Sequence, residues 1–300
     1  RVAVVGGGVA GMSAATVAAS RGHQVTLFEA SHEVGGQFNL AKVVPGKEEF
    51  HETIRYFKVQ IEKTGVDLRL NTKVNREQLE REGFEEIIIA TGVVPRALRI
   101  EGSDSPQVLS YAEVLRGAPV GQKVAVIGAG GIGFDVSEYL LKPEHQPQPQ
   151  PLADWQREWG VDPNPNYVSE GGTQAAEVHP PVREIYLLQR KTSALGAGLG
   201  KTSGWVHRAQ LKKHAVRMLR GVQYKAVTNE GLWVDMAGQD QLLRVDTIVV
   251  CAGQESVKDL MPSAEQNTLA NYHIIGGAKL AAELDAKRAI REGAEIASKL

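Results

Sequence analysis

Short, continuously apolar runs recur along the chain, each followed by a glycine-rich turn or by a longer stretch of helical character. Runs of this length that are rich in Val and Ile predict strands buried on both faces of a parallel sheet. They lie at 2–5, 24–28, 86–91, 123–127, 184–188 and 246–251. Because strand, helix and strand follow one another twice, the pattern predicts an α/β fold with two Rossmann-like dinucleotide-binding domains.

The first run leads directly into a turn with three spaced glycines. Gly6 allows the tight turn, Gly8 lets the backbone approach a pyrophosphate, and Gly11 lets the helix pack closely on the strand. The N-terminus of the following helix offers free N–H groups to phosphates. Glu29 ends the next strand, 18 residues beyond Gly11, where an acid hydrogen-bonds a ribose 2′-hydroxyl. The alternative interpretation of Glu29 is a solvated acid in a loop.

The glycine spacing returns in the second half at Gly128, Gly130 and Gly133, again between a strand and a helix. Two such units in one chain favour two nucleotide sites over a chance pattern. After the next strand the chain reads Gln189-Arg190-Lys191, without the acid of the first site. Arginine and lysine pair with a 2′-phosphate that a carboxylate would repel, so this site is predicted to prefer NADPH to NADH. The alternative is that both bases are ordinary surface cations.

Composition and net charge mainly exclude some classes of function and of binding site. Three hundred residues, 42% apolar and 23% charged, suit two domains. A formal net charge of −1 gives no field that would collect nucleic acid or an anionic membrane, and no apolar run reaches the roughly 20 residues of a membrane span. The single cysteine, Cys251, excludes an internal disulfide and an all-cysteine metal or iron–sulfur site. The eight histidines show no ligand spacing, so no metal is assigned.

Residues 142–181 interrupt the second unit where a short loop is usual, and glutamine alternates with proline at its start. Proline favours extended chain, so a surface loop is expected, with Trp155 and Trp159 as candidate anchors for a partner domain. His207 is expected either to start a helix or to lie near a cofactor. The chain opens at Arg1 within a predicted buried strand, so we expect it to be part of a longer protein.

Several stretches resemble one group of flavoproteins beyond these general motifs. Ala90-Thr91-Gly92 resembles the second FAD signature of glutathione-reductase-like proteins, and Gly35-Gly36 resembles their flavin-contacting turn. The whole chain resembles the C-terminal half of bacterial NADPH-dependent 2,4-dienoyl-CoA reductases, within the old-yellow-enzyme and trimethylamine-dehydrogenase group. The stretches that carry this resemblance are 35–42, 45–50, 188–191, 198–208 and 283–290.

The resemblance implies a glutathione-reductase-like architecture. An NADP(H)-binding domain, 116–253 with the 142–181 loop insertion, would be inserted into an FAD-binding domain made of 1–115 and 254–300. An N-terminal (β/α)₈ barrel, absent from this chain, would carry FMN, a [4Fe-4S] cluster and the acyl-CoA site. NADPH would reduce FAD, and electrons would pass through the cluster to FMN during β-oxidation of unsaturated acyl-CoA. The expected partners are NADPH and this barrel, and the expected location is the bacterial cytoplasm.

The glycine motifs and the resemblance together give the expected cofactor contacts. Glu29 would hold the adenosine ribose, Lys47 would lie near the isoalloxazine or its phosphates, and the Val74 backbone would meet adenine. The expected FAD contacts are Gly6, Gly8, Ala10, Gly11, Glu29, Gly36, Gln37, Lys47, Val74, Ala90, Thr91, Gly92, Gly276 and Gly277. The expected NADPH contacts are Gly128, Gly130, Gly131, Ile132, Gly133, Arg190, Lys191, Ala252 and Gly253. Hydride transfer between stacked rings needs positioning rather than an acid or base, so no catalytic side chain is assigned.

The chain departs from the family pattern at Ile275-Gly276-Gly277-Ala278-Lys279, where many such flavoproteins carry an aspartate that contacts the ribityl chain. FAD would then bind less tightly or through backbone alone. Two alternatives follow. One is a redox-silent, ADP-binding structural domain, as in trimethylamine dehydrogenase. The other is the same input module serving an N-methyl amino-acid demethylase.

Overall fold

The computed structural model describes residues 1–142, 150–164, 172–263, 268–282 and 285–300. Residues 143–149 and 165–171 of the predicted insertion, and 283–284 of the stretch 283–290, lie outside the described residues. The described chain forms two compact units. Unit 1 comprises Arg1–Lys42, Glu49–Val94 and Gln254–Leu300, and unit 2 comprises Val43–Glu48 and Pro95–Gly253.

Unit 1 is built on a parallel sheet with β1 at its centre. In order across the sheet its strands are β15 (Asn271–Ile274), β4 (Glu86–Ile89), β1 (Val2–Val5), β2 (Val25–Phe28) and β3 (Asp67–Arg69). Successive residues of β1 face two different cores: Val2 and Val4 face one, whereas Ala3 and Val5 face the other. Burial on both faces is the reason why this strand is continuously apolar.

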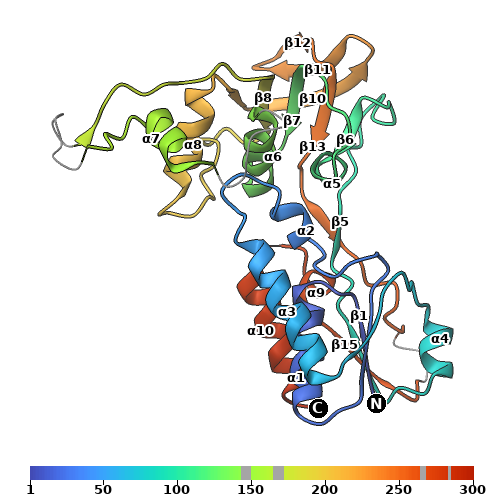
Figure 1. The fold of residues 1–300 in the computed structure, drawn as a ribbon. Coiled ribbons are helices and arrows are strands. Elements are labelled where there is room, and N and C mark those ends of the chain that lie inside the picture. The colour runs from blue at the N-terminus through green and yellow to red at the C-terminus, as the bar shows by residue number, and fades with distance from the viewer. Residues whose placement is uncertain (143–149, 165–171, 264–267, 283–284) are drawn as a thin grey trace. The chain divides into compact units, whose positions relative to one another are not determined.

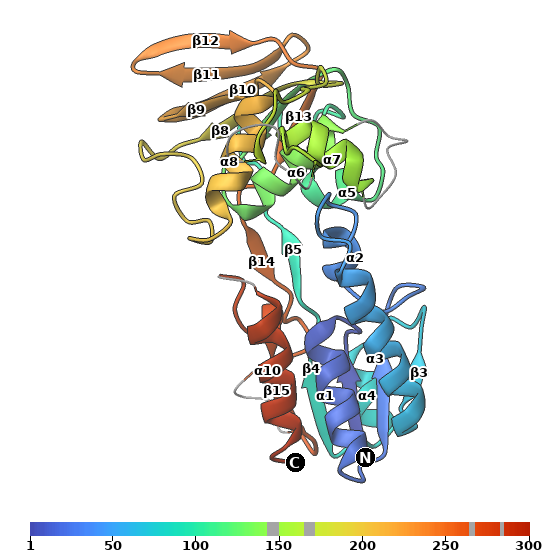
Figure 2. The same cartoon turned by 60° about the vertical axis from the view of Figure 1, so that its left-hand side comes forward.

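Three long helices of unit 1 cover one face of its sheet and lie side by side in Figures 1 and 2: α1 (Val9–Ser20), α3 (Phe50–Thr64) and α10 (Ala286–Ala297). The α1–α10 contact needs glycine, because a Cβ on Gly293 would lie 2.3 Å from the carbonyl oxygen of Ala10. Asp285 caps α10 by accepting a 2.6 Å hydrogen bond from the amide of Arg288. The shorter helices are α2 (Phe38–Ala41), α4 (Arg76–Arg81) and α9 (Gly276–Lys279).

Unit 2 repeats the parallel sheet and adds a second one. Its parallel strands, in order, are β6 (Val108–Ser110), β13 (Thr247–Val250), β7 (Lys123–Ile127), β8 (Glu184–Gln189) and β9 (Arg217–Arg220). The antiparallel strands are β10 (Val222–Thr228), β11 (Gly231–Met236) and β12 (Gln239–Leu243). Val222, Leu232 and Val234 of the antiparallel sheet share a core with Ala125 and Ile127 of β7.

The helices of unit 2 are α5 (Tyr111–Leu115), α6 (Gly131–Leu141), α7 (Leu152–Trp159) and α8 (Gly204–Lys213). Two strands, β5 (Val93–Pro95) and β14 (Gln254–Ser256), pair with each other where the chain passes from one unit to the other and back. In Figure 2 both are seen as extended segments.

The predicted α/β class with two Rossmann-like domains in a glutathione-reductase-like arrangement is confirmed. The N-terminal part of unit 1 ends at Val94, whereas the predicted first segment of the FAD-binding domain ran to residue 115. Residues 95–115 include β6, which belongs to the sheet of unit 2. The predicted loop insertion 142–181 contains a helix, α7, so only part of it is loop. In the part of the chain that the structure describes, no helix is long and apolar enough to cross a membrane.

Candidate nucleotide-binding sites

Three glycines shape the turn between β1 and α1. Gly6 has a φ of +111°, and a Cβ on it would lie 2.3 Å from the carbonyl oxygen of Ala90. A Cβ on Gly11 would lie 1.9 Å from the carbonyl oxygen of Gly6. A Cβ on Gly8, in contrast, would meet nothing within 4 Å, and α1 has no side-chain cap at this residue. Two glycines are therefore required by the fold, and the third leaves space and amides for a pyrophosphate.

Glu29 follows β2 and lies against the glycine turn. Its Oε2 accepts a 2.7 Å hydrogen bond from the amide of Gly7, and its Oε1 accepts bonds of 2.8 and 2.7 Å from the amide and hydroxyl of Ser31. These three bonds hold the carboxylate in one place, so Glu29 is a positioned acid rather than a freely solvated one. Its position beside the turn is where a dinucleotide presents a ribose.

Two further glycines expected at FAD meet this turn. The amide of Gly35 donates a 2.8 Å hydrogen bond to the carbonyl of Gly7. A Cβ on Gly36 would lie 3.1 Å from the Cα of Gly8, and Gly36 adopts a φ of +53°. Gln37 follows, and its Nε2 donates a 3.5 Å hydrogen bond to the carbonyl of Val93. The structure thus brings Gly35 and Gly36 onto the glycine turn of β1, and Gln37 contacts Val93.

The C-terminal segment reaches the same turn through α9. A Cβ on Gly276 would lie 2.9 Å from the Cβ of Ala10, so glycine is needed for this approach. The amide of Gly276 donates a 2.7 Å hydrogen bond to the carboxylate of Glu292 on α10, and the carbonyl of Gly277 accepts one from Ser256. Sequence analysis missed Glu292, the acid that lies at the segment lacking the family aspartate. It is 16 residues away in sequence, and only the fold brings it there.

The other residues expected at FAD differ in their placement. Ala90 borders Gly6, and Thr91 donates a 2.5 Å hydrogen bond from its hydroxyl to the carbonyl of Val257. Gly92 has a φ of +72°, and Val74 is buried in the core on the α4 face of the sheet.

Lys47 does not join the residues of unit 1. It belongs to Val43–Glu48, which groups with unit 2, and its ammonium forms a 2.5 Å ion pair with Asp135 of α6. Within unit 2 the charge of Lys47 is paired with this carboxylate, and its expected contact with FAD stays a prediction.

The glycine turn of unit 2 repeats that of unit 1. Gly128 has a φ of +106°, and its Cβ would lie 2.6 Å from the carbonyl oxygen of Cys251. A Cβ on Gly133 would lie 1.8 Å from the carbonyl oxygen of Gly128, whereas one on Gly130 or Gly131 would meet nothing within 4 Å. Each glycine has the same structural role as its counterpart in the first turn. The protein therefore has two cradles of one kind, and both fit a dinucleotide pyrophosphate.

The remaining predicted NADPH residues surround this turn. Ile132 lies in the first turn of α6, and Ala252 and Gly253 follow β13, where the carbonyl of Gly253 accepts a 3.1 Å hydrogen bond from the amide of Arg96. Cys251 is a free thiol whose pKa is raised by complete burial, which fits the predicted packing role.

The end of β8 carries the chemical difference between the two sites. Gln189 donates hydrogen bonds from its Nε2 to the carbonyls of Lys191 (3.1 Å) and Ser193 (2.8 Å), which shapes the loop after the strand. Arg190 and Lys191 are exposed on this loop. In the described part of the chain neither side chain has a hydrogen-bond or ion-pair partner, so both remain available to an anion.

The sequence did not predict the contact between His207 and Glu138, which joins α8 to α6. His207 of α8 lies with its Nδ1 2.7 Å from Oε1 of the buried Glu138 of α6. The hydrogen bond to Glu138 raises the pKa of His207, against the opposing effect of burial, and Asp135 acts in the same direction as Glu138. His207 lies one turn inside α8, so it fastens two helices together rather than starting one.

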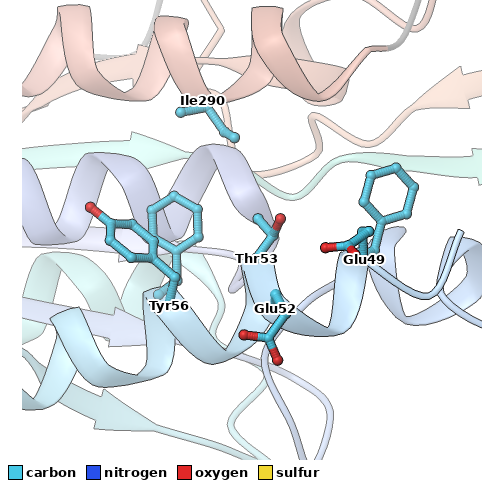
Figure 3. Close-up of a pocket in the computed structure, with 7 residues that line it drawn as sticks. Glu49, Glu52, Thr53, Tyr56 and Ile290 are labelled. Carbon is cyan, nitrogen blue, oxygen red and sulfur yellow. The ribbon is translucent and has the colours of Figure 1, made fainter.

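Unit 1 also has a shallow pocket of about 480 Å³ (Figure 3). It opens on α3 and α10, and its lining residues are Glu49, Phe50, Glu52, Thr53, Tyr56, Phe57 and Ile290. None of the predicted cofactor contacts is among them, so the pocket is not part of either nucleotide site. Among the described residues, no group of three or more His, Cys, Asp or Glu is placed to hold a metal ion.

Known proteins that resemble this chain include enzymes with related sequences and one with a closely similar fold. A metal reductase of Desulforamulus reducens is 29% identical over 93% of this chain and 41% of its own length. A probable N-methylproline demethylase of Rhizobium meliloti is 36% identical over 47% of this chain and 21% of its own. The solved structure of a 2-naphthoyl-CoA reductase with 2-naphthoyl-CoA superposes with a TM-score of 0.80 at 27% identity, covering all of this chain and 40% of that one. The chain thus spans at most about two fifths of these relatives.

The 2-naphthoyl-CoA reductase and the demethylase belong to the old-yellow-enzyme group, so the resemblance to that group is confirmed. The sequence model of one protein family, the pyridine nucleotide-disulphide oxidoreductases, matches residues 1–275 of this chain. Because this match runs through both units and both have the fold it requires, the chain belongs to the pyridine nucleotide-disulphide oxidoreductases, flavin-dependent proteins that use FAD and NAD(P)H.

Proposed function

We propose that the chain is the electron-input module of a 2,4-dienoyl-CoA reductase-type oxidoreductase, with FAD bound by unit 1 and NADPH by unit 2. One observation carries this proposal. The two glycine turns have the same geometry, but the strand after the first ends in a positioned carboxylate, Glu29, and the strand after the second ends in Gln189 with two free cations. A carboxylate suits a ribose with free hydroxyls, and cations suit a ribose 2′-phosphate.

The residues of the chain would bind and orient rather than react. Gly8 and Gly130 would leave room for the two pyrophosphates, and the first amides of α1 and α6 would face them. FAD, when bound, would supply a two-electron acceptor for NADPH that passes electrons on singly. No acid or base is needed for that transfer, and the contribution of the chain is to place the two nucleotides.

The substrate class rests on the relatives. The 2-naphthoyl-CoA reductase acts, by its name, on an aromatic acyl-CoA, and this supports an acyl-CoA as the final electron acceptor. The relatives are more than twice as long as this chain, and the additional length would hold the barrel with FMN and the iron–sulfur cluster that the family resemblance implies. Fatty-acid β-oxidation in the bacterial cytoplasm is part of the same proposal.

A second candidate keeps the same module but changes the substrate. The probable N-methylproline demethylase matches nearly half of the chain, which favours an N-methylated amino acid as the alternative electron partner. In that case NADPH need not be the donor, because the substrate itself is oxidised. Reduction of the flavin by NADPH would therefore favour the reductase over the demethylase.

The test is an anaerobic titration of the flavin-loaded protein with NADPH and, separately, with NADH, followed in the visible flavin spectrum. The proposal expects bleaching by NADPH at a concentration at least tenfold lower than by NADH. Retained flavin without bleaching by either nucleotide would contradict an electron-input role. A protein that retains ADP but no flavin would be the redox-silent domain.

A matched pair of variants connects the result to the residues. Arg190→Gln with Lys191→Gln removes both free cations at the end of β8, whereas Arg217→Gln removes an exposed cation at the opposite end of the neighbouring strand. The first variant should lose the preference for NADPH, and the second should keep it. Equal behaviour of the two would show that these cations do not select the nucleotide.

A further inference from the structure

The glycine turns of the two units make matching hydrogen bonds, so each residue near the turn of unit 2 can be compared with its counterpart in unit 1. The amide of Gly6 donates a 2.8 Å hydrogen bond to the carbonyl of Phe28, and the amide of Gly128 donates one of 2.9 Å to Leu188. Both carbonyls belong to the strand next to the turn. Phe28 therefore corresponds to Leu188, and the residues that follow them correspond one by one.

The correspondence continues to the third strand of each sheet. The amide of Asn71 donates a 2.9 Å hydrogen bond to the carbonyl of Ser31, and the amide of Gly221 donates one of 3.0 Å to Lys191. Asn71 and Gly221 share a left-handed backbone, with φ of 52° and 69°. The strand pairing agrees: Phe28 is opposite Arg69, and the equivalent pair in unit 2 is Leu188 and Leu219.

At four of these corresponding positions unit 2 is more positive than unit 1, whereas Arg69 corresponds to the neutral Leu219. The residue pairs, with unit 1 first, are Glu29 and Gln189, Ala30 and Arg190, Ser31 and Lys191, Leu70 and Arg220. At these four pairs unit 2 has lost one acid and gained three cations. Leu70 packs on the apolar core of unit 1, whereas Arg220 is exposed at the end of β9, directly opposite Gln189.

The cations at this end of the sheet are free, and those at the other end are not. At the amino ends of the strands, Glu184 pairs with Arg217 at 3.2 Å and with Lys123 at 4.0 Å. Within the described residues, the side chains of Arg190, Lys191 and Arg220 have no ion pair or hydrogen bond. Residues 185–229 contain nine Lys and Arg and no Asp or Glu, so no nearby acid in sequence competes for them.

We propose that Arg220 is a third ligand of the 2′-phosphate of NADPH, beside Arg190 and Lys191, and a residue that sets the specificity for that nucleotide. The inference rests on the proposed function and extends it. A phosphate monoester carries a charge between about −1.5 and −2 at pH 7, which more than one cation is needed to balance. A guanidinium binds it with two parallel hydrogen bonds. Arg220 stands on a strand end, which holds it more rigidly than the loop that bears the other two.

The test measures binding of two probes, adenosine 2′,5′-bisphosphate and adenosine 5′-diphosphate, by calorimetry on the flavin-loaded protein. Bound flavin keeps the first site filled, so the probes report on unit 2. Arg220→Gln should weaken the 2′,5′-bisphosphate about tenfold and leave the 5′-diphosphate unchanged. Arg217→Gln, on the same strand, is the matched control and should change neither.

Three other results of this binding experiment would overturn the inference about Arg220. If Arg220→Gln binds both probes like the wild type while Arg190→Gln loses the 2′,5′-bisphosphate, Arg220 is not a ligand, although the NADPH preference stands. If Arg220→Gln weakens both probes equally, its role is not specific to the 2′-phosphate and the inference is overturned. If the wild-type protein binds the two probes equally, the proposed NADPH preference fails together with the inference.

Discussion

Nδ1 of His207 on α8 lies 2.7 Å from Oε1 of Glu138 on α6, and this bond joins α8 to the helix that starts at the second glycine turn. The hydrogen bond raises the pKa of His207, and the charges of Asp135 and Lys47 act on the same ring in opposite directions. A histidine whose folded pKa is raised contributes stability below its unfolded pKa of about 6.5 and loses it as the pH rises through the folded value.

His207→Gln should remove this pH-dependent part of the stability. At pH 6 the variant is expected to unfold with about 1 kcal/mol less free energy than the wild type, and at pH 9 the two should differ less. Urea denaturation at both pH values checks this. His179→Gln, an exposed histidine of the same unit, should follow the wild type at each pH. A His207→Gln deficit that grows towards pH 9 would contradict the account.

The tightest glycines should not tolerate alanine. A Cβ on Gly11 or Gly133 would lie within 2 Å of a backbone carbonyl oxygen, where neither partner can move cheaply. Alanine at either position should lower the free energy of unfolding by roughly 3 kcal/mol, at the upper end of overpacking costs. Thermal unfolding measures this, with Gly198→Ala as a control, because a Cβ there meets nothing within 4 Å. A melting temperature equal to that of the control would show that the close approach is wrong.

Gly130→Ala should separate binding from folding. Gly130 has an extended backbone and open space around it, so alanine fits the folded protein. The added methyl group would occupy the side from which a pyrophosphate approaches. We expect an unchanged melting temperature and a KM for NADPH raised at least tenfold. An unchanged KM would mean that the dinucleotide does not cross this turn.

Glu158 should stabilise the docking of α7 on α8. This buried carboxylate accepts hydrogen bonds from Gln210 (2.8 Å) and Gln150 (2.9 Å) and lies 3.6 Å from both His214 and Lys213. Hydrogen bonding from His214 first, and then these other groups, lowers the pKa of Glu158 well below its usual value, against the effect of burial.

A depressed carboxyl pKa contributes stability above the unfolded value of about 4.5 and loses it as the pH falls. Glu158→Gln should therefore cost about 2 kcal/mol at pH 7, and the difference from the wild type should shrink below pH 4.5. Glu177→Gln, an exposed glutamate of the same insertion, serves as the reference. A deficit that is constant from pH 7 to pH 4 would exclude the charge of Glu158 as the cause.

The strands and glycine turns could be predicted from sequence because local physics determines them. Val2–Val5 and residues 124–127 are apolar on both faces, and a glycine is required where Gly11 and Gly133 pack against a carbonyl oxygen. Glu29 was identified because one helix and one strand fix its spacing from the first turn, and the loop at Arg190 was identified because it follows the next apolar strand, beyond the 142–181 insertion.

The contacts between distant segments could not be predicted in this way. Glu292 reaches Gly276 because α10 folds back on α1, and Arg220 reaches the end of β8 through strand pairing. Neither contact has a sequence pattern of its own. The pairing of Lys47 with Asp135 likewise depends on where 43–48 packs, which no local signal shows.

The most direct test of the account is to give unit 2 the residues of unit 1 at the end of β8, with the triple variant Gln189→Glu, Arg190→Ala and Lys191→Ser. Stopped-flow reduction of the bound flavin, measured anaerobically at limiting concentrations of each nucleotide, gives the second-order rate constants for NADPH and NADH. The account predicts that the wild type prefers NADPH by at least tenfold and that the variant prefers NADH. An NADPH preference that survives in the variant, or flavin that neither nucleotide reduces in the wild type, would contradict it.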